Sequence, residues 1–349
     1  MDVAVVAVVV VVLALAAGCA SSAGAKGSSS GAGAGAGTGT RVRLGYFPNI
    51  THGAALVGLA SGILARDLTP DQLDASQTFN AGPAETQALL SGAIDVAFIG
   101  PSPTISAFTQ SHGAVTVISG AASGGAALVV KSSITTPAEL KGKTIATPQL
   151  GNTQDVALRA YLKGQGFTTD IQGGGQVSVK PQANSQTVTA FQSGAIDGAW
   201  VPEPYVALLV AAGGHVLVNE TTQWPNGKFV TTDVLVRTEF LRAHPASITR
   251  LLTGLVDTID YIGSKPADAQ AAANRQLATL GAPLTPSVLA AAWSDLAFTV
   301  DPLVSTFQKE AANAVAAGLS GSVSLNGLFD LAPLNGVLAA RHRAAVATS

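Results

Sequence analysis

An internal repeat constrains the fold of this chain more than any other feature. The segment Ser91-Gly-Ala-Ile-Asp-Val-Ala-Phe98 recurs as Ser193-Gly-Ala-Ile-Asp-Gly-Ala-Trp200, about one hundred residues later. Each copy closes a predicted amphipathic helix and leads into a short apolar strand. Asn80-Ala81 and Gln182-Ala183 stand at equivalent places before the helix. Two such α/β units predict two lobes with a cleft between them.

Each unit is predicted to contain three strands, each followed by a turn and a helix. The expected strands are Val42–Phe47, Gln77–Phe79, Val96–Ile99, Thr144–Ala146, Val177–Lys180 and Gly198–Val201. Two further extended apolar segments, Ala126–Val130 and Val230–Val236, fit a two-strand hinge between lobes that are discontinuous in sequence. We therefore expect an α/β protein with residues 41–127 and 232–349 in lobe 1 and residues 128–231 in lobe 2.

The tail of the chain is predicted to be mainly helical and to pack on lobe 1. The expected helices are Phe240–His244, Ile248–Ile262, Ala267–Leu280, Pro286–Phe298 and Pro302–Ala317.

The first forty residues have the composition of a targeting segment and a tether. The apolar run Val3–Ala17 is too short to cross a hydrocarbon core of ~30 Å as a helix, but it fits a secretory signal. Ala16-Ala17-Gly18 before Cys19 resembles a bacterial lipoprotein box, so we expect a signal peptide over 1–18 and a lipid on Cys19. Residues 19–40 would form a flexible Gly/Ser/Ala tether. Because Met1-Asp2 lacks the usual basic start, an ordinary cleaved signal or a plain anchor stays an alternative.

Composition and motifs exclude several classes of function. With 19 Lys+Arg against 21 Asp+Glu, the chain lacks the basic face of a nucleic-acid-binding protein. A single Cys excludes a disulfide framework or a Cys-ligated cluster. The Gly-x-Ser-x-Gly match Gly27–Gly31 lies in the tether, and Gly142-Lys143-Thr144 follows Pro137 where a phosphate-binding loop needs glycine. We expect no enzyme activity, no metal and no cofactor.

Polar junctions follow the six expected strands, where ligands bind in open α/β sheets. They are 48–52, 80–83, 100–104, 149–154, 182–186 and 201–204, and each carries Ser, Thr, Asn or Pro where a helix would begin. Each junction taken alone is explained equally well as a helix cap. Together, several of them are expected to line the cleft.

The distribution of charge indicates what the cleft binds. No Lys or Arg occurs over residues 67–130, 144–158 or 181–227. An anion would therefore be held by backbone N–H groups, hydroxyls and amides at helix N-termini, unless Arg41, Arg159 or Lys228 reaches in. This favours a sulfonate, sulfate or nitrate over a free amino acid, whose carboxylate usually meets an arginine.

The motifs together resemble the SsuA/TauA/NMT1-like family of substrate-binding proteins of ABC transporters. The resemblance covers nearly all of residues 41–335, and its motifs are 43–52, 79–83, 98–103, 120–125, 147–155, 200–204 and 329–331. It implies a type II periplasmic-binding-protein fold whose two lobes close on an aliphatic sulfonate, taurine or nitrate. It also implies that the protein is an extracytoplasmic monomer. Its expected partners are a membrane permease and an ATPase subunit. The thiamine-pyrimidine branch carries a Cys-rich motif that is missing here.

By the family's layout, fifteen residues are expected at the ligand. They are Asn49, Thr51, His52, Ala81, Gly82, Pro101, Ser102, Ala122, Ser123, Gln149, Gly151, Asn152, Thr153, Trp200 and Glu203.

For several of these residues, the position in the sequence is equally consistent with a structural role. His52, Ser102, Ser123 and Thr153 suit helix capping as well as ligand contact. Trp200 is either a stacking face for the ligand or strand-end packing. An acid such as Glu203 would either pair a ligand ammonium or stabilise its helix N-terminus, and Asp155 has the same two readings.

Two other classes of protein fit the sequence less well than a transporter component. A sensory module on the same fold needs an effector region, and no sequence typical of one occurs from Arg41 to Ser349. An anchored hydrolase needs a nucleophile paired with a base, and the sequence contains no motif typical of such a pair. A receptor for nitrate or another organic anion, not coupled to sulfonate uptake, stays the nearest alternative.

Overall fold

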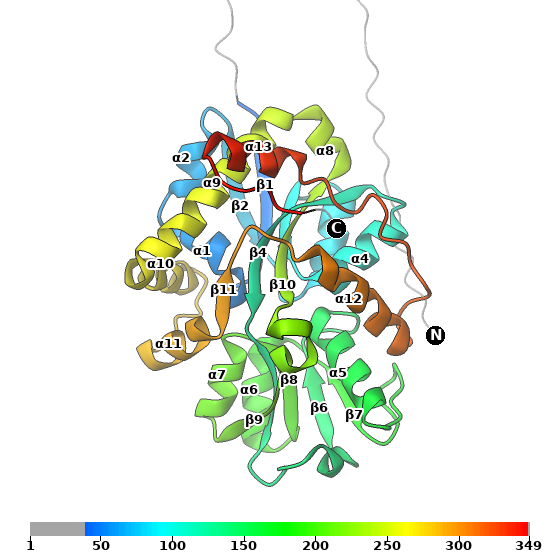
Figure 1. Ribbon diagram of the computed structural model, residues 1–349. Coiled ribbons are helices and arrows are strands. Elements are labelled where there is room, and N and C mark those ends of the chain that lie inside the picture. The colour runs from blue at the N-terminus through cyan, green and yellow to red at the C-terminus, as the bar shows by residue number, and fades with distance from the viewer. Residues whose placement is uncertain (1–38, 348–349) are drawn as a thin grey trace, which may run out of the picture. The chain divides into compact units, whose positions relative to one another are not determined.

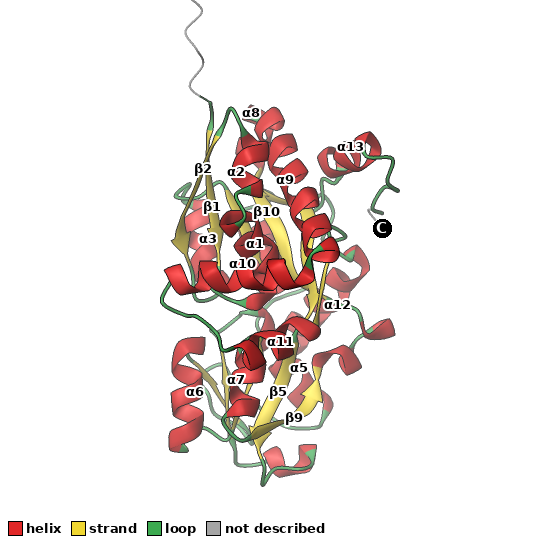
Figure 2. Ribbon diagram, turned by 90° about the vertical axis from the view of Figure 1, so that its left-hand side faces the viewer, coloured by secondary structure: helices red, strands yellow, loops and turns green. Residues whose placement is uncertain are grey.

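The computed structural model describes residues 39–347, which form an α/β protein with two mixed β-sheets (Figures 1 and 2). This confirms the predicted fold class. The predicted signal peptide, Cys19 and nearly all of the predicted tether lie outside the described residues. Within residues 39–347, no helix has both the length and the apolarity needed to cross a bilayer.

The first sheet has six strands in the order β11-β4-β10-β3-β1-β2. Strand β1 runs parallel to β2 and β3, whereas β10 runs antiparallel to β3 and β4. The strands are β1 (Arg41–Tyr46), β2 (Gln72–Thr78), β3 (Val96–Ile99), β4 (Val115–Gly124), β10 (Val230–Arg237) and β11 (Leu296–Phe298). Segments far apart in the sequence therefore build one sheet.

The second sheet has five strands in the order β7-β6-β8-β5-β9. Strand β6 runs parallel to β7 and β8, and β5 runs antiparallel to β8 and β9. The strands are β5 (Ala126–Lys131), β6 (Thr144–Thr147), β7 (Ser178–Pro181), β8 (Gly198–Pro202) and β9 (Gly214–Asn219). The trio β6, β7 and β8 repeats the arrangement of β1, β2 and β3, as the sequence repeat predicts.

The aspartates of the two repeat motifs, Asp95 and Asp197, make equivalent hydrogen bonds in the two sheets. An Asp95 carboxylate oxygen accepts a hydrogen bond from the Arg43 N–H (3.0 Å), and the Asp95 N–H donates to the Arg43 carbonyl (2.8 Å). Asp197 makes the same two bonds to Thr144, at 2.9 and 2.8 Å. Each motif therefore fixes the start of the first strand of its unit to the third strand.

The chain passes between the sheets twice. It first crosses at Gly124-Gly125, where φ is 83° and 70°, a backbone conformation that suits glycine. It returns after β9 through two short 3-10 helices, η3 (Glu220–Gln223) and η4 (Pro225–Gly227). The expected extended segments Ala126–Val130 and Val230–Val236 are confirmed as parts of β5 and β10.

Helices cover both faces of each sheet (Figure 2). Alternation along the strands divides the cores: Val96 and Phe98 face one core, and Ala97 and Ile99 face the other. The helices are η1 (Ile50–His52), α1 (Gly53–Ala60), α2 (Ile63–Leu68), α3 (Gly82–Leu90), α4 (Pro101–Gln110), η2 (Pro137–Leu140), α5 (Thr153–Gly164), α6 (Asn184–Ser193), α7 (Tyr205–Ala211), α8 (Thr238–Ala243), α9 (Pro245–Ser264), α10 (Pro266–Thr279), α11 (Pro286–Ser294), α12 (Val304–Ala316) and α13 (Ala332–Ala340).

The tail differs from the prediction in two ways. Helices α9, α10 and α13 pack around the first sheet as expected, but α11 also contacts α7, and α12 contacts both α4 and α5. The tail therefore packs on lobe 1, as predicted, and also contacts the second lobe, which the prediction did not include. The predicted helix Pro286–Phe298 ends at Ser294, because Leu296–Phe298 pairs with the free edge of β4 as strand β11.

Candidate functional site

A small cavity lies where the carboxyl ends of the parallel strands of both sheets meet. We call it the inter-lobe cavity, and its volume is about 20 Å³, room for about one water molecule. Its lining comes from the segments that follow β1, β2, β3, β6 and β7, from the end of β8 and from β10. The lining residues are Phe47, Asn49, Thr51, His52, Asn80, Gly100, Asn152, Thr153, Gln154, Asn184, Pro202 and Thr231.

Two helices of the second lobe begin at this cavity. Asn152 is the N-cap of α5 in an extended conformation (φ −73°, ψ 160°), and Thr153 is the first helical residue. Helix α6 begins at Asn184. The first turn of a helix leaves backbone N–H groups unpaired and carries about half a positive charge, so both helix ends favour an anion.

Two side chains in the cavity are buried without hydrogen-bond partners. Thr153 Oγ1 and Asn184 Oδ1 make no hydrogen bond in the structure, and the two residues are 2% and 4% exposed. An unpaired buried polar group costs about 1–3 kcal/mol, so native proteins rarely keep one without a reason. Both groups are therefore available to a ligand held between the lobes.

His52 enters the cavity as an uncharged donor. Its Nδ1 accepts a hydrogen bond from the Phe47 N–H (3.2 Å), which leaves the proton on Nε2. Its ring also stacks on the Phe47 ring, with centroids 4.2 Å apart. Because the side chain is fully buried, desolvation lowers the pKa of His52 to about 3. The ring is neutral near pH 7, where Nε2–H can donate to an anion.

The lining of the inter-lobe cavity contains no Lys, Arg, Asp or Glu. Arg159, the nearest buried cation along the chain, is held by Asp155 (3.1 Å) and by the Asp170 carbonyl (2.6 Å). Arg41 forms an exposed ion pair with Asp74 (2.7 Å). Neither arginine lines the cavity, nor does Lys228. Neutral donors and acceptors thus surround the space, as the charge distribution in the sequence predicts.

Asp155 organises the loop that carries Asn152 and Thr153. Its carboxylate accepts hydrogen bonds from Thr147 Oγ1 (2.8 Å), the Gly151 N–H (3.0 Å) and Arg159 Nε (3.1 Å). Of its two proposed roles, the structure fits the one at the helix N-terminus. Asp155 fixes the start of α5 and does not face the cavity.

The two lobes touch directly beside the cavity. The Gly82 N–H donates to Asn152 Oδ1 across the lobes (3.3 Å). Gly100 lies so close to Thr153 that a methyl group at Gly100 would be 2.4 Å from Thr153 Oγ1. The lobes are therefore closed on one another, and the loop with Asn152 and Thr153 supplies part of the contact.

Residues 35–278 match the NMT1-like family. The chain belongs to this family. It is 32% identical over 182 residues to the taurine-binding periplasmic protein of Escherichia coli (strain K12), a match that covers 51% of this chain and 54% of that protein. The match thus spans about half the length of that relative. A binding protein of Brucella abortus (strain 2308) is 26% identical over 230 residues, which are 64% of this chain and 68% of the relative.

Solved structures of binding proteins share the fold. The alkanesulfonate-binding protein SsuA from Xanthomonas axonopodis pv. citri, bound to MOPS, aligns with a TM-score of 0.69 and 19% identity, over 84% of this chain and 99% of that chain. The periplasmic nitrate-binding protein NrtA from Synechocystis PCC 6803 aligns with a TM-score of 0.73 and 14% identity, over 86% and 89%. These structures show that the fold is shared with this chain.

The structure brings five of the fifteen expected site residues into the lining of the inter-lobe cavity. They are Asn49, Thr51, His52, Asn152 and Thr153. Gly82 touches this group through its backbone bond to Asn152. The other residues do not line the cavity: Ala81, Pro101, Ser102, Ala122, Ser123, Gln149, Gly151, Trp200 and Glu203.

Trp200 lies in the hydrophobic core of the second lobe. In strand β8 its neighbours Ala199 and Val201 face α6 and α7, so Trp200 faces the opposite side, toward α5. The side chain is fully buried, and its Nε1 donates to Glu220 (2.7 Å). It packs within the lobe and lines a different cavity from the one between the lobes.

Glu203 and Ser102 are engaged within the protein. Glu203 Oε2 accepts a hydrogen bond from the Ala207 N–H in the first turn of α7 (3.2 Å). Burial raises the pKa of Glu203 to about 8, with a further contribution from nearby Asp295. The Ser102 hydroxyl donates to Glu310 of α12. Of the two roles considered for Glu203, stabilisation of a helix N-terminus fits the structure. Ser102 instead binds helix α12 in the C-terminal part of the chain.

Some lining residues are absent from the expected set. Asn80, Gly100, Asn184 and Pro202 belong to the polar junctions, so placing whole junctions at the cavity would have found them. Thr231 lies on β10, which crosses back to the first sheet. Its hydroxyl group, within an otherwise apolar segment, was the feature of the sequence that could have indicated a place at the cavity.

Proposed function

We propose that this protein is the extracytoplasmic solute-binding component of an ABC importer. It captures a small oxyanion, an aliphatic sulfonate, between its lobes and delivers it to the membrane permease and ATPase subunits. The observation that carries the proposal is the inter-lobe cavity, which is lined by uncharged groups, receives the N-termini of α5 and α6, and holds the buried Thr153 hydroxyl without a partner, so that it can donate to an anion. The relatives named for taurine, alkanesulfonate and nitrate support the same class of ligand.

Closure of the lobes is the proposed means of capture. The donors come from loops of both lobes, so an oxyanion engages its full set of partners only when the lobes meet around it. In this structure the cavity of about 20 Å³ has room for about one water molecule, so the lobes must part to admit a sulfonate and close less tightly around it. A ligand that binds the closed state more tightly shifts the population toward that state, and the permease would recognise the closed surface. The contacts of Gly82 and Gly100 with the α5 loop are those that form on closure.

Within the sulfonates, we propose that an amine is not required. Glu203 and Asp155, the carboxylates considered as partners for a ligand ammonium, are bound to Ala207 and to the α5 loop. No carboxylate lines the cavity. A taurine ammonium would lose its hydration without gaining an ion pair, so ethanesulfonate should bind at least as tightly as taurine.

We further propose that the protein acts as a lipid-anchored monomer at the outer face of the membrane. The signal over 1–18, the lipid on Cys19 and the tether up to residue 40 would hold the binding unit near its permease. The periplasmic relative supports the extracytoplasmic site. We expect no cofactor and no nucleic acid among its partners.

Isothermal titration of Thr38–Ser349, which forms a compact unit, tests the ligand class. The titrants are ethanesulfonate, taurine, nitrate, sulfate and glutamate. One-to-one binding of ethanesulfonate, at least as tight as taurine, is the expected result. Preference for nitrate over every sulfonate would instead support the nitrate receptor. Binding of glutamate alone, or of none of the five, would overturn the oxyanion proposal.

A further inference from the structure

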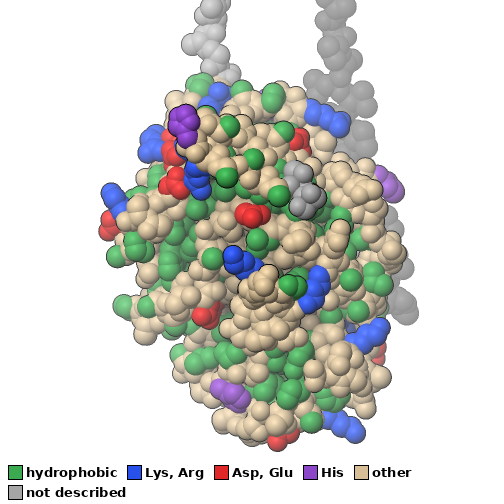
Figure 3. All heavy atoms as spheres, in the orientation of Figure 1, with side chains coloured by type: hydrophobic (Ala, Val, Ile, Leu, Met, Phe, Trp, Pro, Cys, Tyr) green, Lys and Arg blue, Asp and Glu red, His purple; other side chains and the backbone are tan. Residues whose placement is uncertain are grey.

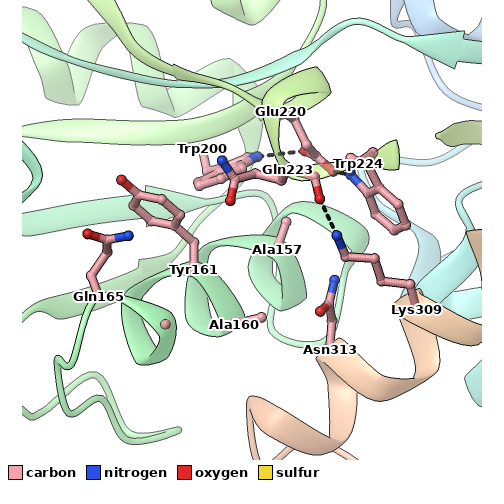
Figure 4. Close-up of a pocket in the computed structure, with 11 residues that line it drawn as sticks. Ala157, Ala160, Tyr161, Gln165, Trp200, Glu220, Gln223, Trp224, Lys309 and Asn313 are labelled. Atoms are coloured by element: carbon pink, nitrogen blue, oxygen red, sulfur yellow. Dashed lines mark hydrogen bonds between the residues drawn. The ribbon is translucent and has the colours of Figure 1, made fainter. Parts of the chain in front are cut away.

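A second cavity, with a volume of about 170 Å³, lies against helix α5 (Figure 4). We call it the α5–α12 cavity, since its walls come from α5, from α12, from η3 with the following Trp224, and from Trp200 of β8. It shares no lining residue with the inter-lobe cavity. We propose that the α5–α12 cavity binds a single-ring aromatic anion, with benzoate as the simplest example.

The size and the floor of the cavity fit one aromatic ring. An engineered apolar cavity of about 150 Å³ in another protein binds benzene, so about 170 Å³ is enough for a ring with one substituent. Ala157, Ala160 and Gly164 form the floor, at spacings that put them on one face of α5. These small residues let a flat ring approach the helix closely.

The walls are aromatic and are held in place. Tyr161 and Trp200 meet with ring centroids 5.5 Å apart at a tilt of 58°. Glu220 accepts hydrogen bonds from both indoles, Trp200 Nε1 at 2.7 Å and Trp224 Nε1 at 3.3 Å (Figure 4). The indoles are thus fixed before any ligand arrives. A further ring can meet them in tilted or offset geometries, which aromatic pairs prefer.

The charges around the cavity favour an anion. Lys309 of α12 is the basic residue in its lining. Its Nζ donates to the Gln223 backbone carbonyl (Figure 4) and lies 4.9 Å from the centre of the Trp224 ring, and its positive charge remains at the cavity wall. The Asn313 amide follows one turn later on the same helix face. Lys163 donates to the Ala316 carbonyl (3.0 Å), which adds a second cation between α5 and α12. Glu220, the acid in the lining, is turned to the two indoles.

Benzoate binding to the full-length protein, followed by titration calorimetry and tryptophan fluorescence, tests the proposal. We expect saturable one-to-one binding. Gly164→Leu should abolish it, because no atom lies within 4 Å of a side chain begun there and the leucine can fill the ring's space. Lys309→Met should weaken benzoate about fivefold, as for a partly exposed ion pair, while leaving neutral benzyl alcohol unchanged. Lys141→Met, on an exposed residue of the same lobe, is the matched control.

Several results would overturn the proposal. One is the absence of saturable benzoate binding; another is full binding by a folded Gly164→Leu variant. If benzyl alcohol binds as tightly as benzoate, the site does not select an anion. Loss of benzoate binding in Thr153→Val but not in Gly164→Leu would place benzoate between the lobes instead. Thermal unfolding checks that each variant folds, and Ala160→Leu repeats the test from the same floor.

Discussion

The Thr153 hydroxyl gives the sharpest test of the inter-lobe cavity. Thr153→Val keeps the shape of the side chain and removes a buried hydroxyl that has no partner. We expect sulfonate affinity to fall at least about tenfold, because a hydrogen bond to a charged group contributes about 1.5–3 kcal/mol. The unfolding free energy should not fall, since the hydroxyl bonds nothing in the protein. Titration calorimetry and urea unfolding measure both, with exposed Thr109→Val as the control. Unchanged affinity would contradict the assignment.

Glu203 predicts a pH dependence of stability. Its folded pKa is raised to about 8, above the ordinary value near 4.5, because the buried carboxylate is desolvated. The unfolded state therefore loses this proton more easily, and stability is lost as the pH rises from about 4.5 through about 8. Glu203→Gln, which keeps the acceptor for Ala207, should equal the wild type near pH 4 and exceed it at pH 9. Urea unfolding at both pH values is the measurement, and equal curves at pH 9 would refute it.

At the level of single residues, the sequence predicts which residues lie near the ends of strands better than it predicts which way their side chains point. Asn49, His52 and Thr153 reach the cavity because they follow strand ends, where position alone decides which space they face. Trp200 also stands near a strand end, but it lies within the strand, where the phase of the pleat turns it toward α5. One residue of phase cannot be read from a five-residue apolar strand buried on both faces.

Helix α5 depends on a buried ion pair at its first turns. Asp155 and Arg159 are 0% and 1% exposed, so removing one charge leaves the other buried alone. We expect Asp155→Asn to lower the unfolding free energy by about 3–5 kcal/mol. The double variant Asp155→Asn with Arg159→Met should recover part of this loss, because it removes both charges. Urea unfolding compares the three proteins, and a double variant no more stable than the single one would refute the account.

At the level of elements, strand β3 is predicted well and strand β2 only in part, whereas the buried strand β4 and the edge strand β9 were not predicted. The prediction for β3 agrees with Val96–Ile99, all four residues of which are buried. Strand β2 spans Gln72–Thr78, whereas the prediction gave only Gln77–Phe79. It is an edge strand with polar and exposed residues, so it lacks the apolar run that marks a strand in sequence.

At the level of the whole molecule, the repeat predicts the two lobes but not the route of the tail. Helix α12 meets α4 and α5, and its Glu310 accepts a hydrogen bond from Ser102. Its surface therefore faces parts of both lobes, and that surface exists only once the lobes are assembled. Charged side chains on this face of residues 39–347 are scattered rather than gathered in one basic patch (Figure 3).

Gly100 sets how closely the lobes can meet. Alanine there would put a methyl group 2.4 Å from Thr153 Oγ1 at the start of α5, whereas the Thr231 carbonyl, on strand β10 of the first sheet, stays at 3.5 Å. Gly100→Ala should therefore leave each lobe folded and hold the pair apart. We expect weaker sulfonate binding and a larger radius of gyration at saturation, measured by X-ray scattering.

Gly336→Ala on α13 provides the matched control, because no atom lies within 4 Å of its added methyl group. It should close and bind as the wild type does, with about 1 kcal/mol of added helix stability at most. If Gly100→Ala binds with wild-type affinity and compacts fully, the contact between Gly100 and Thr153 does not limit closure. The helix N-termini of the two lobes would then have to hold the anion without meeting at this point.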